Sequence, residues 1–269
     1  LMKQVVRELR QSQFVPTDFE LEIGQLSGDD VPRVPSVVLT LPDGARIRVQ
    51  GKVDRVDVYR QNDISYVRII DYKTGQKQFR LSDVVAGINL QMLIYIMSIW
   101  QNGGARYGQV QPAGLLYLPA KLPVLKVDRC ADGDALERAD IRAMRMNGLL
   151  LDHPDIVRAM EADGAGLFVP ARINAKGELS HDASVASLAQ FGQLKKRVDK
   201  LLTDMAETLR RGDIAAVPAC GAVEACTYCE YRAVCGFEPG DPVRFIAQQD
   251  AATVWKELAA EQEQEEQHE

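Results

Sequence analysis

The chain has 269 residues, of which 46% are hydrophobic and 26% charged, enough apolar material to bury a substantial core in one large domain or two small ones. Its formal net charge of −6 excludes a uniformly basic nucleic-acid binder, so any binding of a polyanion must depend on local groups of positive side chains. No run of about 18 apolar residues and no positively charged leader is present, which predicts a cytoplasmic protein with no membrane partner.

The first 120 residues are expected to form a helix, several consecutive strands, a second helix and a further strand. The opening stretch LMKQVVRELRQ has the pattern of a helix. Alternating apolar and polar residues, separated by turn residues such as Pro-Asp-Gly, predict an antiparallel meander. Its strands are expected at residues 19–23, 37–41, 46–59 and 66–72. A helix is then expected from Ser82 to Gly103, followed by a buried strand at 114–120.

The remaining 149 residues, 121 to 269, are less regular at first and then helical. A charged helix at about 135–150 with Gly and Pro breaks beyond it suggests an insertion, a long amphipathic helix is expected at 183–211, and the Glu/Gln-rich end at 259–269 has a disordered composition. The predicted organisation is as follows: a core that carries the main motifs at 1–120, an insertion or subdomain at 121–182, a long helix and cysteine-rich region at 183–240, and a C-terminal helix with an acidic tail at 241–269.

Two acids and a lysine are expected to converge on the predicted sheet. In RIIDYKTG, strand alternation sends Asp71 and Lys73 to one face and Tyr72 to the other. Asp54 in GKVDRVD lies on the preceding strand and can meet Asp71 across an antiparallel ladder. Like charges at close range favour a divalent cation, so we expect Mg²⁺ held by Asp54, Asp71 and the backbone carbonyl of Tyr72, with Lys73 orienting the attacking water. The competing interpretation is an exposed ion pair.

The following helix adds a second polar pair. Gln91 and Tyr95 are spaced i, i+4 and share one face, where they could contact the nucleic-acid backbone or hold Lys73; otherwise Tyr95 is a core residue with a solvated hydroxyl. Asp57 has the opposite strand parity to Asp54, so we expect it to pair with an arginine such as Arg55 or Arg60.

GKVDRVD, RIIDYKTG and LQMLIY, in that order, resemble the nuclease motifs of the RecB-like branch of the PD-(D/E)xK superfamily. RAMRMNGLLLDHPDIVRAME and CTYCEYRAVCGF further resemble the C-terminal part of the AddB family, the B subunits of ATP-dependent helicase/deoxyribonucleases. The resemblance implies an α/β, restriction-endonuclease-like core: a mixed, mostly antiparallel sheet flanked by helices, with a helical insertion and a C-terminal cysteine–metal loop. It assigns catalysis to Asp54, Asp71 and Lys73, supported by Gln91 and Tyr95.

Three clustered cysteines, Cys226, Cys229 and Cys235, have the spacing of metal ligands, because a two-residue gap lets two thiolates turn toward one ion. By spacing alone, Cys220 can complete a four-thiolate zinc site, whereas a distant fourth thiolate would make a 4Fe-4S cluster. The family resemblance implies the 4Fe-4S cluster, with its fourth cysteine far upstream.

The function expected from these features is a Mg²⁺-dependent DNA exonuclease module of a helicase-nuclease that processes double-strand ends for recombinational repair. Its partners would be DNA, as double-strand ends and single strands, and an AddA-like helicase/nuclease subunit. Two alternatives stay open: a catalytically inactive, nuclease-like DNA-binding or scaffold module, and a standalone or CRISPR-associated RecB-like exonuclease.

Overall fold

The computed structural model describes residues 1–24, 34–75, 77–121, 132–227 and 229–266. The chain divides into two compact units, each of which is built from several stretches of sequence. Unit 1 comprises residues 1–39, 48–79 and 91–195, and unit 2 comprises residues 40–47, 80–90 and 196–269.

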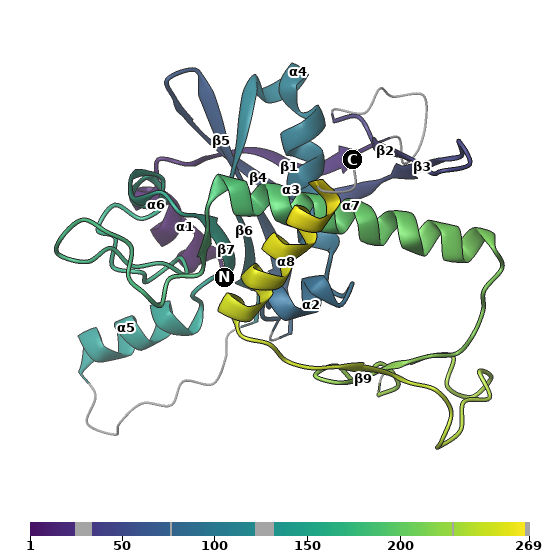
Figure 1. Ribbon diagram of the computed structural model, residues 1–269. Helices are drawn as coiled ribbons and strands as arrows, with labels where there is room; N and C mark the ends of the chain where they lie inside the picture. The colour runs from purple at the N-terminus through teal and green to yellow at the C-terminus, as the bar shows by residue number, and fades with distance from the viewer. Residues whose placement is uncertain (25–33, 76, 122–131, 228, 267–269) are drawn as a thin grey trace. The chain divides into compact units, whose positions relative to one another are not determined.

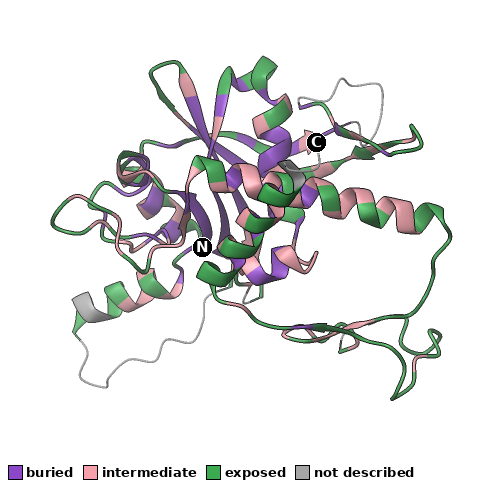
Figure 2. Cartoon of the chain, viewed as in Figure 1, coloured by how far each residue is buried: buried purple, intermediate pink, exposed green. Residues whose placement is uncertain are grey.

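A six-stranded mixed sheet forms the centre of unit 1 (Figure 1). In spatial order its strands are β1 (Val15–Ile23), β4 (Gly51–Gln61), β5 (Ile64–Lys73), β6 (Gln109–Pro119), β7 (Asn147–Leu151) and β8 (Val185–Ala186). The pairs β1–β4, β4–β5 and β6–β7 are antiparallel, whereas β5–β6 and β7–β8 are parallel. Most residues of β4 to β7 are buried, as Figure 2 shows by its purple strands, so both faces of the central strands are covered.

Helices complete unit 1. They are α1 (Met2–Gln11), α3 (Gln91–Asn102), α4 (Gly104–Tyr107), α5 (Gly133–Ala143), α6 (Pro154–Met160) and the first residues of α7 (Leu188–Arg210). The α3 helix packs on β4, β5 and β6 through apolar residues at helical spacing, including Met92, Ile96 and Ile99. It also provides the crossover that a parallel β5–β6 pair requires.

Unit 2 is smaller than unit 1, and helices make up most of its regular secondary structure. It contains α2 (Leu81–Val85), most of α7, α8 (Ala251–Glu266) and a parallel strand pair, β9 (Ala219–Gly221) with β10 (Arg244–Ile246). The tip of the hairpin formed by β2 (Val37–Thr40) and β3 (Arg46–Val49) also belongs to this unit. The α8 helix buries Val254 and Leu258 and packs against α2.

Several predicted boundaries are wrong, and local backbone geometry gives the reason for one of them. The strand expected at 46–59 is two strands, β3 and β4, interrupted at Gln50. The helix expected from Ser82 to Gly103 is two helices, because Gly87 and Asn89 adopt φ angles of 74° and 57°, which end a right-handed helix.

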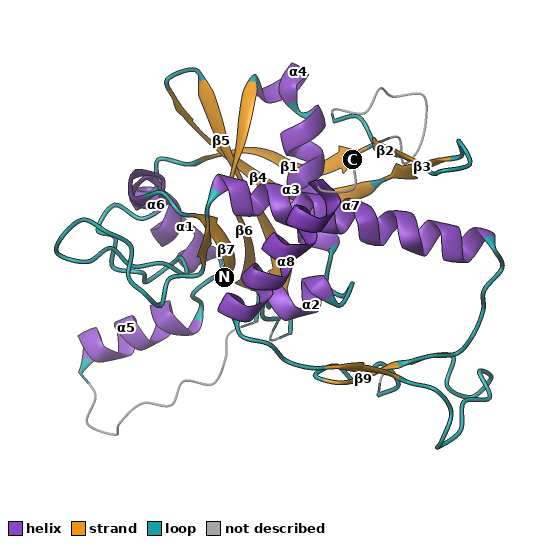
Figure 3. Ribbon diagram, in the orientation of Figure 1, coloured by secondary structure: helices purple, strands orange, loops and turns teal. Residues whose placement is uncertain are grey.

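In the C-terminal half, the helix expected at 135–150 ends at Ala143, and the apolar run NGLLL forms strand β7 instead (Figure 3). The segment expected as an insertion therefore contributes a strand to the central sheet. The long helix begins at Leu188 rather than at 183, after β8. Most of the tail expected to be disordered belongs to α8, while residues 267–269 lie outside the described residues.

Among the helices in the described part of the chain, none combines the length and the apolar character that crossing a membrane requires.

Candidate active site

Asp71 and Lys73 lie near the end of β5 and form an ion pair. Lys73 Nζ is 2.6 Å from Asp71 Oδ2. The Asp71 residue is only 4% exposed, whereas 31% of the Lys73 side chain is accessible to solvent. Alternation along an extended strand brings the two side chains to one face, as the sequence predicts. The alternative of an exposed ion pair does not fit the acid, which is buried.

Asp54 comes to the same place from β4. The antiparallel register pairs Arg55 with Ile70, so that Asp54 lies one step further along the ladder, opposite Asp71. The Asp54 Oδ2 atom accepts a hydrogen bond from the backbone N–H of Tyr72 at 2.9 Å. Neighbouring strands therefore bring together the two carboxylates that the sequence singles out.

Electrostatics make Asp71 an unusual acid. Burial raises the pKa of Asp71, the ion pair with Lys73 opposes this rise, and the charge of Asp54 raises the pKa further. Its Oδ2 atom is buried and makes no hydrogen bond of good geometry within the described residues, despite the nearby ammonium group. Oxygen donors of this kind suit a hard divalent cation such as Mg²⁺, which needs only one or two protein carboxylates. The residues present therefore fit the ion.

Gln91 and Tyr95 lie in the first turns of α3 and interact as the i, i+4 spacing predicts. Gln91 Nε2 donates to the Tyr95 hydroxyl at 3.2 Å, and the backbone N–H of Lys52 donates to the same hydroxyl at 3.4 Å. Within the described residues neither side chain hydrogen-bonds to Lys73. A Cβ atom on Gly51 would come within 2.3 Å of the Tyr95 ring, so only glycine permits this close approach. Tyr95 therefore braces the start of the strand that carries Asp54.

Asn147 holds the segment that follows Lys73, a role that the sequence did not indicate. Its side chain accepts a hydrogen bond from the N–H of Phe79 at 2.9 Å and donates one to the carbonyl of Lys77 at 2.7 Å. The N–H of Ala120 donates to the Lys73 carbonyl at 2.8 Å. The only sequence signal is a polar residue immediately before the apolar run of β7.

The opposite face of β4 and β5 carries a second set of charges. The predicted pairing of Asp57 with Arg55 is present as two hydrogen bonds of 2.6 Å. Sequence reasoning missed Arg68 and Glu8, which join the same group. Arg68 could have been noticed as a charge inside the apolar stretch YVRII, whereas Glu8 has no distinguishing signal in the sequence.

The cysteines lie in a largely exposed part of unit 2, with Cys226 and Cys220 half-buried and Cys229 and Cys235 exposed. Successive turns connect three of them: the N–H of Cys229 donates to the Cys226 carbonyl at 3.5 Å, and the N–H of Cys235 to the Tyr231 carbonyl at 3.0 Å. In the described ranges no group of three or more His, Cys, Asp or Glu side chains is gathered closely enough to hold a metal ion. The donor chemistry suits a thiophilic metal, and the cluster stays a prediction.

Comparison with known proteins identifies relatives along nearly the whole chain. The B subunit of the ATP-dependent helicase/deoxyribonuclease of Thermoanaerobacter sp. (strain X514) is 32% identical over 263 residues, which cover 96% of this chain and 22% of that protein. The protein of the same name from Symbiobacterium thermophilum is 36% identical over 239 residues, with coverages of 87% and 20%. The one from Acetivibrio thermocellus is 31% identical over 267 residues, with coverages of 97% and 23%. The chain thus spans about a fifth of the length of these relatives.

The family profile of the PD-(D/E)XK nuclease superfamily matches residues 1–236. This match agrees with the mixed, mostly antiparallel sheet and its flanking helices, which confirms the expected restriction-endonuclease-like core, while the cysteine–metal loop stays a prediction. It also covers the acids of β4 and β5, the Gln91–Tyr95 pair and the clustered cysteines. The chain belongs to the PD-(D/E)XK nuclease superfamily.

Proposed function

We propose that this chain is a Mg²⁺-dependent deoxyribonuclease domain that acts as an exonuclease on DNA ends. The observation that carries the proposal is the meeting of two carboxylates and one ammonium group, from Asp54, Asp71 and Lys73, on one face of a PD-(D/E)XK sheet. Two acids and one amine leave a net negative site, which attracts a divalent cation and, through it, a phosphate.

Each residue has a role in this proposal. The carboxylates of Asp54 and Asp71, with the backbone carbonyl of Tyr72, would hold Mg²⁺. When bound, the ion would polarise the phosphodiester and supply an activated water for attack at phosphorus. Lys73 stands beside Asp71, where its ammonium group can orient the water and offset the negative charge that grows on the phosphate as the P–O bond breaks. Gln91 and Tyr95 support the strand that carries Asp54.

The substrate and partners follow from the names of the relatives. Those proteins are B subunits of ATP-dependent helicase/deoxyribonucleases, so we propose that this domain cuts single strands at double-strand ends during recombinational repair. An AddA-like helicase/nuclease subunit would be its partner. Because the chain as a whole is acidic, binding would depend on local cations and on that partner.

The test is degradation of end-labelled linear DNA in Mg²⁺ by the wild type, Asp71→Ala, Lys73→Ala and a matched control, Asp155→Ala. The control removes an acid that is 68% exposed and pairs with Arg158 on α6. We expect cleavage by the wild type and the control, loss of about 100-fold or more in the two site variants, and no cleavage in excess chelator. Equal cleavage by all four proteins, or by none, would favour the alternative of an inactive DNA-binding scaffold.

We also propose that Cys226, Cys229 and Cys235 ligate a 4Fe-4S cluster that closes a long loop and so stabilises the fold. The two-residue gap and the turns that follow it support this proposal. Iron and sulfide analysis with visible absorbance tests it. A colourless protein that carries one zinc would indicate the alternative site, with Cys220 as the fourth ligand.

A further inference from the structure

Behind the candidate active site lies a buried charge cluster, formed by Glu8 of α1, Arg55 and Asp57 of β4, and Arg68 of β5. All four residues are 0–3% exposed. Arg55 forks onto both oxygens of Asp57 at 2.6 Å. Arg68 donates to Asp57 Oδ2 from Nε at 2.9 Å and from Nη2 at 2.8 Å, and Nη2 also donates to Glu8. Asp57 thus binds both arginines, and Glu8, which also accepts hydrogen bonds from both, links them to the helix.

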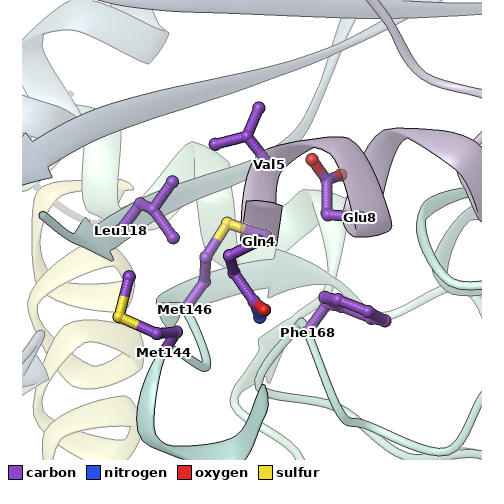
Figure 4. Close-up of a pocket in the computed structure, with 7 residues that line it drawn as sticks. All are labelled: Gln4, Val5, Glu8, Leu118, Met144, Met146 and Phe168. Atoms are coloured by element: carbon purple, nitrogen blue, oxygen red, sulfur yellow. The ribbon is translucent and has the colours of Figure 1, made fainter. Parts of the chain in front are cut away.

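Stability does not explain this cluster. Its two cations and two anions balance, but each has lost its water, and replacing such a buried group with apolar side chains is often neutral or stabilising. One Arg68 nitrogen, Nη1, has no hydrogen-bond partner within the described residues. The residues of α1 that are buried are Gln4 and Glu8, both polar, and Figure 4 shows Gln4 directed toward Met146 and Phe168 while the Glu8 carboxylate is directed away from them. This helix is therefore docked by charge and hydrogen bonding rather than by an apolar stripe.

The position of the cluster gives it another use. Asp57 lies opposite Arg68 in the β4–β5 ladder, and Arg55 lies opposite Ile70. Asp54 and Asp71 are the adjacent residues on the same two strands, and their side chains point to the other face. Because a one-residue slip would exchange the two faces, bonds that clamp β4 to β5 at this step also set the separation of the two carboxylates. The contact that crosses the ladder joins Arg68 of β5 to Asp57 of β4, where two N–H groups of one guanidinium converge on Asp57 Oδ2, while Arg55 fixes both oxygens of Asp57 from within β4.

We propose that Glu8, Arg55, Asp57 and Arg68 are positioning residues, which hold the Asp54 and Asp71 carboxylates in register from behind and make that register depend on the docking of α1. The proposal rests on the proposed function of those two acids. None of the four residues contacts the substrate in this scheme, and each acts through the backbone of β4 and β5.

Glu8→Gln is the sharpest test, because the variant keeps the shape and an acceptor oxygen while it leaves the two arginines with one anion. Asp18→Asn is the matched control. Asp18 is also a buried acid of the same sheet, 2% exposed, but it lies on β1 rather than on the two strands of the site. It accepts hydrogen bonds from Arg106 Nε at 2.8 Å and from the Tyr107 hydroxyl at 2.7 Å.

Two readouts separate positioning from plain stability. The first is whether a loss of DNA cleavage lies in kcat or in KM, measured at a temperature well below the unfolding transitions of both variants. The second needs neither metal nor substrate: it is the hydrogen exchange of the Tyr72 amide, followed by NMR, because this N–H donates to Asp54. For Glu8→Gln we expect kcat to fall by about ten- to a hundredfold at unchanged KM, and the Tyr72 amide to exchange about tenfold faster than in the control.

Arg68→Lys keeps the charge but replaces the two planar N–H donors that converge on Asp57 Oδ2 by a point charge. It provides a second variant if Glu8→Gln does not fold, and the same two changes are expected from it. The proposal is overturned if the variant and Asp18→Asn show equal kcat and equal Tyr72 exchange. Asp71→Ala, measured beside them, identifies the cause of a negative result. An inactive Asp71→Ala with a normal Glu8→Gln rejects the positioning role alone, whereas a fully active Asp71→Ala rejects the proposed function.

Discussion

The two faces of the β4–β5 ladder carry charge groups that differ in their balance of positive and negative side chains. On one face, Asp54 and Asp71 meet beside the ammonium group of Lys73, so two negative charges face one positive charge and the Asp71 carboxylate has a raised pKa. On the other face, two arginines meet two acids, and Asp57 accepts four hydrogen bonds from them. Apart from Lys73 and Glu8, both sets come from two short runs, GKVDRVD and RIID.

The difference teaches how to distinguish a structural charge group from a reactive one. A group that serves the fold balances its charges and buries them completely. A group that awaits a ligand has an excess of one sign and keeps a path to solvent, as the partly exposed Lys73 does here. Charge balance, rather than burial alone, therefore distinguishes the face that we propose as the metal and substrate site.

The largest expected effect on stability comes from removing one charge of the balanced cluster. Asp57→Asn removes the acid that binds both arginines and leaves two buried cations with one anion, so the free energy of unfolding should fall by about 3–5 kcal/mol. Urea unfolding followed by circular dichroism measures this change. A loss under about 1 kcal/mol would mean that water reaches the cluster and that the contrast between the faces is false.

On the other face, which carries Asp54, Asp71 and Lys73, removing a charge is expected to raise stability rather than lower it. Because the folded-state pKa of Asp71 is raised, the folded protein binds this proton more tightly than the unfolded chain, and ionisation of Asp71 costs stability. The cost is absent below the unfolded pKa of about 3.9, develops as the pH rises through the folded pKa, and is complete above it. Asp71→Asn should therefore melt at a higher temperature than the wild type at pH 7 but not at pH 3. A variant less stable than the wild type at pH 7 would contradict this.

The smallest effect is expected at the solvent-accessible ion pairs between α1 and α5. Arg7 contacts Glu137 at 2.8 Å and Asp140 at 3.3 Å, and 32–55% of each of these side chains is exposed to solvent. Arg7→Ala should change the free energy of unfolding by about 0.2–1 kcal/mol, and salt should reduce the difference further. If Arg7→Ala proves as costly as Asp57→Asn, α1 is held at its surface rather than through Glu8.

Much of the candidate site could be predicted from local periodicity. Strand alternation placed Asp71 with Lys73, and Asp54 across the ladder from them, because two-residue spacing needs no knowledge of the rest of the fold. Helical spacing likewise placed Gln91 beside Tyr95. The same reasoning failed where an apolar run had no distinctive period, so NGLLL was expected to be helical and is strand β7.

The sequence by itself determined the order of the motifs, the family, and which side chains share a face of β4 and β5, since each depends on neighbours a few residues apart. Tertiary structure alone decided that Glu8 joins Arg55 and Arg68, 47 and 60 residues away, and that Asn147 secures the segment after Lys73. Contacts over such distances are set by how helices and strands pack, and no pattern in a short stretch of sequence encodes them.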